Sequence, residues 1–181
     1  MYLLTAPTVE PVSVSDAKLA LHIDDDRYDD VLPSKIAAAR EEAEHEAGWR
    51  FVQQTWRIEL KEWPAADFEI YIYRPTACAI TYWDGSAWVS LSGSAFAFAP
   101  SIGSGNRTIL APALGTSWPS LGDIAAGARV RIDLTTGVAP EDAATLPKCI
   151  REYMIDAIGE ALGSRPHNEY RARKLDPVRV H

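Results

Sequence analysis

The sequence changes its hydrophobic period abruptly between residues 41 and 64, where it reads EEAEHEAGWRFVQQTWRIELKEWP. Before Gly48 the apolar residues recur at three- and four-residue steps, which is typical of an amphipathic helix. After Gln53 apolar and polar residues alternate, which is typical of a strand with one buried face. Gly48 itself is a favourable C-terminal cap for the helix. The chain therefore has to join a helical part to a β part within a few residues.

A long helix is predicted over residues 30–47, and Pro33 is compatible with it because a residue in the first turn donates no intrahelical hydrogen bond. Its apolar stripe is narrow and rich in alanine, which allows close approach to a neighbouring helix. The stripe consists of Leu32, Ile36, Ala39, Ala43 and Ala47. Arg40, Glu41 and Glu44 are expected on the polar faces.

Two shorter helices are predicted on either side of the β part. One begins with Ser15 as its N-cap and ends near Leu21, with Leu19 on its apolar side. The other runs from Leu146-Pro147 to about residue 162, because proline fits the first position of a helix. The apolar stripe of this last helix is formed by Ile150, Met154, Ile158, Ala161 and Leu162.

The middle of the chain consists of short alternating segments separated by Gly, Ser and Pro, which predicts antiparallel strands. Asp84-Gly85 is a hairpin signal between two of these segments. The predicted strands span residues 53–62, 68–73, 78–83, 87–91, 95–98, 108–111 and 128–136.

These elements together predict an α+β fold in one domain over residues 1–181, a length that is sufficient for a single core. A small helical platform is expected from residues 12–50 and 144–163, with an antiparallel sheet or sandwich inserted at residues 51–140. Residues 164–181 form an extended C-terminal tail in this interpretation. Because this tail has little apolar content, we expect it to be poorly ordered unless a partner holds it.

Charge is distributed unevenly along the chain, whose formal net charge is −7. Residues 1–50 hold five basic and eleven acidic side chains, whereas residues 165–181 hold five Lys or Arg and two acidic side chains. This contrast is typical of a polar body with a tail that docks elsewhere, although a solvated tail without a partner is equally compatible with it. The net negative charge argues against DNA binding through phosphate neutralisation.

The polar residues show no arrangement that predicts catalysis or metal binding. None of the four histidines (His22, His45, His167 and His181) lies three or four residues from another His or a Cys. Cys78 and Cys149 have no zinc spacing and are expected to be small core residues. We therefore expect a protein that is not an enzyme and that carries no cofactor or metal.

The acidic run at residues 24–30 lacks the glycine and the glutamate that an EF-hand loop requires at its sixth and twelfth positions. We interpret it as a linker whose carboxylates cap the following helix. The chain also lacks an apolar run of about 18 residues and a signal-peptide pattern at its start. We therefore expect no membrane association, and we expect the protein to be made in a cytoplasm.

The tryptophans leave a second function open. Trp56, Trp63, Trp83, Trp88 and Trp118 are more typical of an aromatic core, but such residues also form stacking platforms for sugars or bases. The alternative to a structural protein is therefore a small soluble sugar- or nucleotide-binding β module flanked by helices.

Several short motifs resemble phage head–tail connector (adaptor, head-completion) proteins of long-tailed phages and gene-transfer agents. Residues 12–23 (VSVSDAKLALHI) are similar to the opening helix of that family, and residues 36–44 (IAAAREEAE) followed by Gly48 are similar to its second helix. Residues 54–64 resemble the strand that follows, through Gln54-Thr55-Trp56, Leu60 and Trp63-Pro64. Thr136-Gly137 and Leu146-Pro147 resemble the later strand end and the start of the last helix. The details of residues 65–135 and of the tail beyond Arg165 do not match the family.

The resemblance implies a structural protein of the virion neck that forms a ring of about twelve copies, a closed symmetric assembly. Such a ring connects the portal to the tail and leaves a channel through which DNA passes without sequence-specific binding. The implied partners are further copies of the chain, the portal protein and a tail-side neck or tail-completion protein. We add the hypothesis that an acidic face lines the channel, so that DNA slides through without sticking.

The basic tail is the part that we expect to insert into or wrap around the portal, because of its charge contrast with the body. The expected portal-binding residues are Arg165, Tyr170, Arg171, Arg173, Lys174, Leu175, Val178 and Val180.

Overall fold

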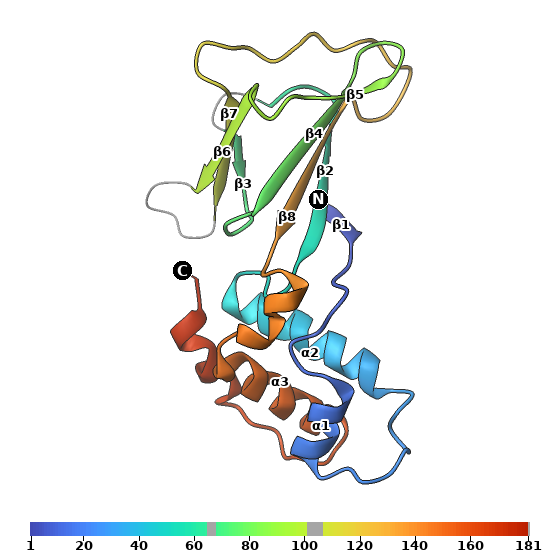
Figure 1. Cartoon of the computed structure of the whole chain (residues 1–181), viewed down its shortest axis with the longest axis vertical. Helices are drawn as coiled ribbons and strands as arrows, with labels where there is room; N and C mark the ends of the chain where they lie inside the picture. Colours follow the sequence, from blue (N-terminus) through green and yellow to red (C-terminus); the bar gives the residue numbers. More distant parts are fainter. Residues whose placement is uncertain (65–67, 101–106, 181) are drawn as a thin grey trace. The chain divides into compact units, whose positions relative to one another are not determined.

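The computed structural model of the chain describes residues 1–64, 68–100 and 107–180 (Figure 1). It confirms the α+β class, with helices and antiparallel sheets. The chain divides into two compact units. The β unit consists of Met1–Ala6 and Gln53–Gly137, and the helical unit consists of Pro7–Val52 and Val138–His181.

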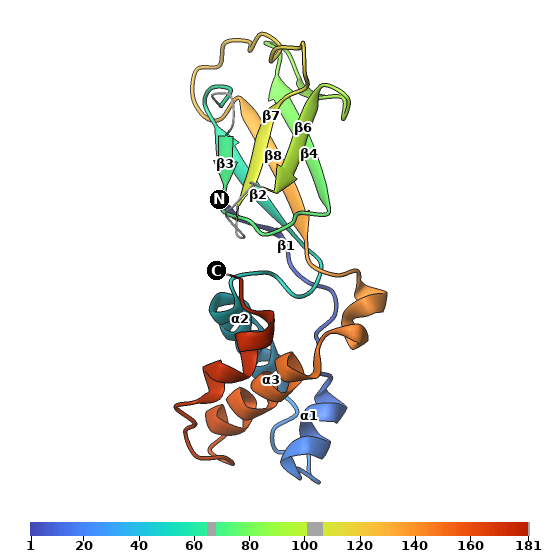
Figure 2. The ribbon, with the colours of Figure 1, turned by 90° about the vertical axis from the view of Figure 1, so that its left-hand side faces the viewer.

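The β unit is a sandwich of two antiparallel sheets that face each other (Figure 2). The larger sheet has the strand order β1-β2-β8-β4-β5, and the smaller has the order β3-β7-β6. The strands are β1 (Tyr2–Thr5), β2 (Gln54–Leu60), β3 (Phe68–Ile70), β4 (Ala77–Trp83), β5 (Trp88–Ser90), β6 (Phe96–Pro100), β7 (Thr108–Pro112) and β8 (Val130–Thr136).

The core of the sandwich follows from the period-two pattern of its strands. In β8 every second residue is buried, so that Val130, Ile132 and Leu134 point into the core together with Ile80 of β4. From the facing sheet, Leu110 of β7 contributes to the same core. The intervening residues of β8 form pairs across the sheet surface, as when Arg57 Nε donates to Asp133 Oδ1 at 2.7 Å.

The seven predicted strands are present with ends shifted by a few residues, whereas β1 is an addition. Residues 1–14 are expected to be extended, but nothing in the sequence indicates a partner for them. In the structure β1 pairs antiparallel with β2, with Tyr2 opposite Arg57 and Leu3 opposite Trp56. A four-residue segment with this little pattern is assigned to a sheet by its tertiary neighbour and not by its own sequence.

The helical unit contains α1 (Val14–Leu21), α2 (Leu32–Ala47) and α3 (Lys148–Ala161), and α2 and α3 lie side by side (Figures 1 and 2). Two 3₁₀-helices complete it, η1 (Pro140–Thr145) and η2 (Arg171–Val178). The predicted stripe of α2 is buried along its whole length, and Gly48 ends this helix at a φ of 80°. In α3, Ile150, Met154 and Ile158 are fully buried as expected.

Three details of the helix predictions are wrong. Ser13, not Ser15, is the N-cap of α1, and it forms a capping box with Asp16. Leu19 is 79% exposed although it was expected on the apolar side of α1. Ala161 is likewise exposed at the end of α3. Short helices leave one face free, so periodicity alone does not determine which apolar residue is covered.

The acidic run before α2 does not cap that helix. The N-cap is Val31, without a side-chain hydrogen bond. Instead Lys18 Nζ lies 2.7 Å from Asp29 Oδ1 and 3.4 Å from Asp26 Oδ1, and Arg27 pairs with Asp25. Asp26 and Asp29 therefore hold the linker to α1 through surface ion pairs, whereas the Arg27–Asp25 pair lies within the linker.

Two charged residues expected on the polar faces of α2 are buried. Arg40 is 4% exposed and Glu44 is 1% exposed. Arg40 Nη1 donates to Glu44 Oε2 at 3.0 Å, and Phe51 N–H donates to Glu44 Oε1 at 2.9 Å. Arg40 Nε also donates to Glu10 Oε2 at 2.9 Å. The cluster joins α2 to the segments before α1 and after α2, and each buried charge has a partner as burial requires.

The C-terminal tail is folded onto the helical unit, which corrects the expectation of a poorly ordered segment. Residues 171–178 form η2, and Leu175 is fully buried in the core between helices. The expectation was wrong because the segment is held chiefly by ion pairs and one apolar anchor, which a low apolar content does not reveal.

Candidate partner-binding surface

The eight residues expected to bind the portal lie in the loop after α3, in η2 and, for Val180, just after η2, all within the helical unit. The structure brings them together but gives them different environments. Some pair with acidic side chains of α2 and α3, some anchor the tail in the core, and two face solvent.

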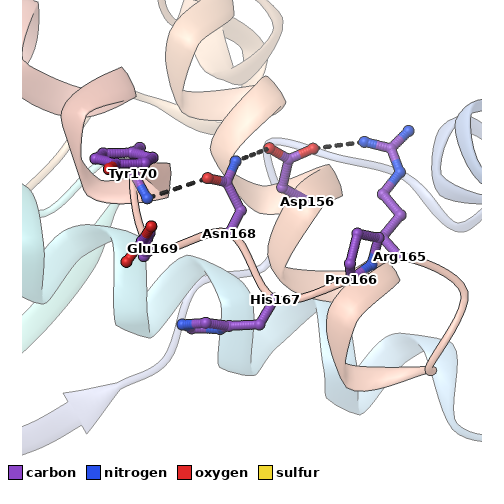
Figure 3. Close-up of a pocket in the computed structure, with 7 residues that line it drawn as sticks. All are labelled: Asp156, Arg165, Pro166, His167, Asn168, Glu169 and Tyr170. Atoms are coloured by element: carbon purple, nitrogen blue, oxygen red, sulfur yellow. Dashed lines mark hydrogen bonds and ion pairs between the residues drawn. The ribbon is translucent and has the colours of Figure 1, made fainter.

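Asp156 of α3 is the centre of the first group of contacts. Arg165 Nη1 donates to it at 2.5 Å and Asn168 Nδ2 at 3.5 Å (Figure 3). Lys174 Nζ also donates to Asp156, at 2.5 Å. Burial alone would raise the pKa of Asp156, but the hydrogen bonds and positive charges of Lys174 and Arg165 outweigh it and lower this pKa below its ordinary value. The carboxylate is therefore held ionised and closes the loop after α3.

Arg171 bridges the two long helices. Its Nη2 donates to Glu42 Oε1 of α2 at 2.5 Å, and its Nη1 pairs with Glu160 of α3. The guanidinium carbon also lies 5.2 Å from the centre of the Tyr153 ring, within cation–π range. Tyr153 OH donates to the same Glu42 oxygen at 2.8 Å, and burial together with this bond raises the pKa of Tyr153 to about 12.

Glu160 receives a second partner, since His167 Nδ1 contacts its carboxylate. The hydrogen bond from His167 lowers the pKa of Glu160 by more than desolvation raises it, and Arg171 lowers this pKa further. The basic side chains of the tail thus meet acidic side chains of the body, which neutralises charge on both sides.

The end of the tail is fixed by three backbone contacts besides the burial of Leu175. Trp49 Nε1 donates to the carbonyl oxygen of Val178 at 2.8 Å. Val180 N–H donates to the carbonyl oxygen of Ala47 at 2.8 Å. Arg179 Nε donates to the carbonyl oxygen of Glu46 at 3.0 Å. The C-terminal turn of α2 therefore receives the chain end.

Tyr170 and Arg173 are the predicted residues that face solvent. Tyr170 is 55% exposed, and Arg173 is exposed as well. The Arg173 guanidinium carbon lies 4.7 Å from the centre of the Tyr170 ring. The pair forms a preformed cation–π unit on the outer side of the tail, a combination that is enriched at protein interfaces.

A pocket of about 400 Å³ lies beside this pair, lined by Asp156 and by residues 165–170 (Figure 3). Asp156 is bonded to Arg165, and the Tyr170 backbone N–H donates to Asn168 Oδ1 at 3.0 Å. Because these lining groups bond to one another, the pocket is a feature of the folded loop and gives no chemical indication of a ligand.

The acidic partners of the tail were not identified from the sequence. Asp156 and Glu160 are four residues apart on α3, and so they share a face of that helix with Glu152. The tail carries its own basic residues at close spacing, Arg171 and Lys174. The opposite charges of this α3 face and of the tail could have indicated that the tail docks there. The contact of Trp49 with the tail could not have been predicted in this way, because its partner is a backbone carbonyl.

The tryptophans of the β unit are engaged with other parts of that unit. Trp63 and Trp118 stack on each other with ring centres 4.7 Å apart. Trp63 Nε1 donates to Pro119 O, and Trp118 Nε1 donates to Pro64 O. Trp88 carries the Arg131 guanidinium 3.8 Å from its ring centre. These contacts occupy the ring faces that a sugar or base would use, so they favour the core role for these residues.

The described residues also give no indication of metal or thiol chemistry. Within them, no group of three or more His, Cys, Asp or Glu side chains is arranged to hold a metal ion. Both cysteines are free thiols, and burial raises the pKa of Cys78 to about 12, which leaves it protonated at neutral pH. Across residues 1–64, 68–100 and 107–180, no helix has the length and hydropathy needed to cross a membrane.

The sequence was compared with the models of known protein families. Residues 11–73, which include α1, α2, β2 and β3, match the model of the phage gp6-like head-tail connector proteins. The resemblance to the head–tail connector family is confirmed. The matched segment contains α1, α2 and β2 with the motifs of residues 12–64, whereas the motifs Thr136-Gly137 and Leu146-Pro147 lie outside it.

Solved structures extend the likeness beyond the connector segment to the whole fold. A chain in the neck of an empty gene transfer agent (GTA) particle computed with C6 symmetry has a TM-score of 0.73 at 18% identity, covering 100% of this chain and 96% of that one. A chain from the virion of a native GTA particle gives 0.72 at 18% identity, covering 99% and 94%. A chain in a native GTA neck computed with C12 symmetry gives 0.68, again at 18% identity. At this identity the likeness shows a shared fold. No curated protein matches the chain significantly.

Proposed function

We propose that the chain is a structural protein of a virion neck, a head–tail connector that forms a ring of about twelve copies between the portal and the tail, as closed symmetry allows. The observation that carries the proposal is the combination of the connector match over residues 11–73 with a fold shared along the whole chain with GTA neck proteins. One of these neck structures has C12 symmetry. In this proposal the whole chain works as one connector domain, made in the host cytoplasm and used in the virion.

The role is structural and not enzymatic. The family model describes a connector, which is not a class of enzyme. Asp156 and Glu160 of α3, whose pKa values are lowered, are paired with basic side chains of the same chain. Their shifted pKa values are therefore explained by structural ion pairs.

A DNA channel is compatible with the charge of the helical unit. This unit has twelve Lys or Arg and eighteen Asp or Glu side chains, a net charge of −6. Most arginines and lysines of the chain are paired with carboxylates, as Arg40, Arg165 and Arg171 are. Paired cations release fewer counterions from DNA, so DNA would pass such a surface without tight binding.

The portal contact is proposed to involve the docked tail. Tyr170 and Arg173 offer their side chains to a partner directly, because both are exposed and already ordered against each other. In the free protein Arg165, Arg171, Lys174 and Leu175 hold the tail on the body. Val178 and Val180 position its end through their backbone groups.

The ring is tested by negative-stain electron microscopy and light scattering on the purified protein, alone and mixed with the portal protein. Closed rings with a mass of about twelve chains are expected, at least when the portal is present as a template. A protein that stays monomeric with the portal at high concentration would exclude the connector function.

The tail contact is tested with the double variant Tyr170→Ala/Arg173→Ala in a portal-binding assay. Binding should weaken at least about tenfold, because paired aromatic and arginine residues dominate many interfaces. Arg27→Ala is the matched control, since Arg27 also lies over a tyrosine, Tyr28, with its guanidinium carbon 5.8 Å from the ring centre. Equal affinities of the two variants would refute a portal contact at Tyr170 and Arg173.

A further inference from the structure

Strand β1 is an open edge of the five-stranded sheet. It pairs with β2 on one side and stands at the end of the order β1-β2-β8-β4-β5 (Figure 1). The register shifts between Leu3 and Thr5, so Leu4 lies at an irregularity of the pairing. An edge strand presents a row of backbone N–H and C=O groups that another chain can pair with.

This edge is short and has an irregularity at Leu4, but it lacks the side chains that usually protect an edge from pairing. Native edge strands commonly carry charged side chains or proline, yet residues 1–6 contain neither. Tyr2, Leu3 and Leu4 are 45%, 39% and 41% exposed. Three neighbouring large apolar side chains on an edge without charged residues or proline indicate a surface that is covered in the assembled protein.

We propose that β1 is the edge at which one copy of this chain receives the next copy in the ring. The proposal rests on the proposed connector function and names the surface through which the ring closes. A ring needs a heterologous contact, so β1 of one copy meets a different surface of its neighbour. Backbone pairing along the edge gives the affinity, and the exposed apolar side chains are buried at the contact.

The charge of the chain favours a second copy as the occupant. Each copy carries a formal net charge of −7, and the helical unit accounts for most of it. Identical acidic chains repel one another, so they approach at least cost where the surface has no charged side chains. Residues 1–6 provide such a surface, whereas a basic partner would be drawn to the acidic helical unit instead.

The test places a charge at the edge. Leu4→Lys in the full chain should raise the protein concentration for half-assembly at least about tenfold, because a buried apolar contact is lost and lysine protects edges from pairing. Leu19→Lys is the matched control, since Leu19 is also an exposed leucine, at 79%, but lies on α1. It adds the same positive charge to the chain. Assembly is measured by sedimentation velocity with and without the portal, and folding by circular dichroism.

The outcomes separate the two proposals. If the wild type assembles and only Leu4→Lys fails, the assignment of β1 is supported. If Leu4→Lys assembles like the wild type, or both lysine variants fail equally, the assignment of β1 is refuted while the ring stands. If the wild type stops at a dimer or stays monomeric with the portal present, the ring itself is refuted and the assignment with it.

A second measurement does not depend on weakening the contact. A photoreactive amino acid at position 4 of otherwise unchanged protein should cross-link to a second copy of the chain in the assembled state. Cross-linking to the portal alone would overturn the proposal. Should Leu4→Lys lose its native circular dichroism, Leu3→Lys takes its place in the assembly test, since Leu3 is exposed to a similar degree.

Discussion

The helical unit buries charge, whereas the β unit keeps its ion pairs near the sheet surface. In the helical unit the side chains of Arg40 and Glu44 are 5% and 1% exposed. In the β unit the side chains of Arg57 and Asp133 are 21% and 22% exposed, although their pairing is bidentate. This difference indicates that the stability of the two units is sensitive to different changes. The helical unit should be sensitive to the loss of a charge partner, and the β unit to the loss of apolar volume.

The composition of the two cores explains this difference. The buried stripe of α2 contains three alanines, and an alanine buries little apolar surface. The β unit fills its core with Val130, Ile132 and Leu134 and with partly buried tryptophans. The small apolar contribution of this stripe is supplemented by the buried hydrogen bonds that Glu44 accepts from Arg40 and from Phe51 N–H. These bonds stabilise only while every member is present.

The largest effect is expected for Glu44→Ala. It removes the acceptor of Phe51 N–H and the most deeply buried partner of the Arg40 guanidinium, so unfolding of the helical unit should become easier by about 4 kcal/mol. Urea denaturation followed by far-ultraviolet circular dichroism measures it. Glu41→Ala is the control on the same helix, because the Glu41 side chain is 68% exposed and should change stability by no more than about 0.5 kcal/mol. Similar losses for both variants would break the distinction between buried and surface charge.

A nearly equal effect is expected for Ile132→Ala in the centre of the sandwich. Ile132 is fully buried on β8, and the cavity should cost about 3 kcal/mol. Tryptophan fluorescence during denaturation reports chiefly the β unit, which contains five of the six tryptophans. If the units unfold separately, the helical circular dichroism signal should be lost at a higher denaturant concentration than the one at which the fluorescence changes. Coincident transitions would show that the two units unfold as one.

Leu175→Ala should release the tail at a smaller cost. The side chain is fully buried, but it belongs to a short terminal segment, so we expect a loss of about 2 kcal/mol that is confined to this segment. Hydrogen exchange of the Val180 amide, which bonds to Ala47, should speed up markedly while α2 amides stay protected. Leu114→Ala, at a fully exposed leucine of the β unit, provides the control.

Tail docking should also depend on pH in the acidic range. The pKa values of Asp156 and Glu160 are lowered in the folded protein from the ordinary 3.8 and 4.5. Their contribution is therefore fully present above the ordinary values and is lost as the pH falls through the lowered ones. Exchange of the Val180 amide, corrected for its intrinsic rate, should show this loss. Asp156→Asn should flatten the pH dependence, and an unchanged profile would contradict the assigned role of this carboxylate.

The smallest effect is expected for Arg131→Met on the sheet surface. The variant removes the ion pair with Glu59, whose atoms are 3.2 Å apart, and the stacking on Trp88. Partly exposed contacts of this kind contribute only about 0.5 to 1 kcal/mol. A thermal shift of a few degrees or less should be observed. A loss as large as that of Glu44→Ala would mean that surface pairs matter as much in the β unit as buried ones do in the helical unit.

Much of the fold could be predicted because its signals are local. The stripe of α2 follows the helical period, Gly48 marks the end of that helix, and the alternation in β2 and β8 identifies strands with one buried face. The candidate site was less predictable. The basic residues of the tail were recognised by composition, but their acidic partners lie up to 133 residues away in sequence, as Glu46 does from Arg179.

The sequence by itself determined the α+β class, the position of the long helix, the β-rich middle and the contrast between an acidic body and a basic tail. These properties depend on residue type and spacing within one element, which physical chemistry constrains locally. The tertiary structure alone decided that Arg40 and Glu44 are buried, that β1 is an open sheet edge and that the tail folds back through Arg171 and Leu175. Those features depend on which groups meet across long sequence separations, and the energy of a charge or an apolar side chain is set by that meeting and not by its neighbours in the chain.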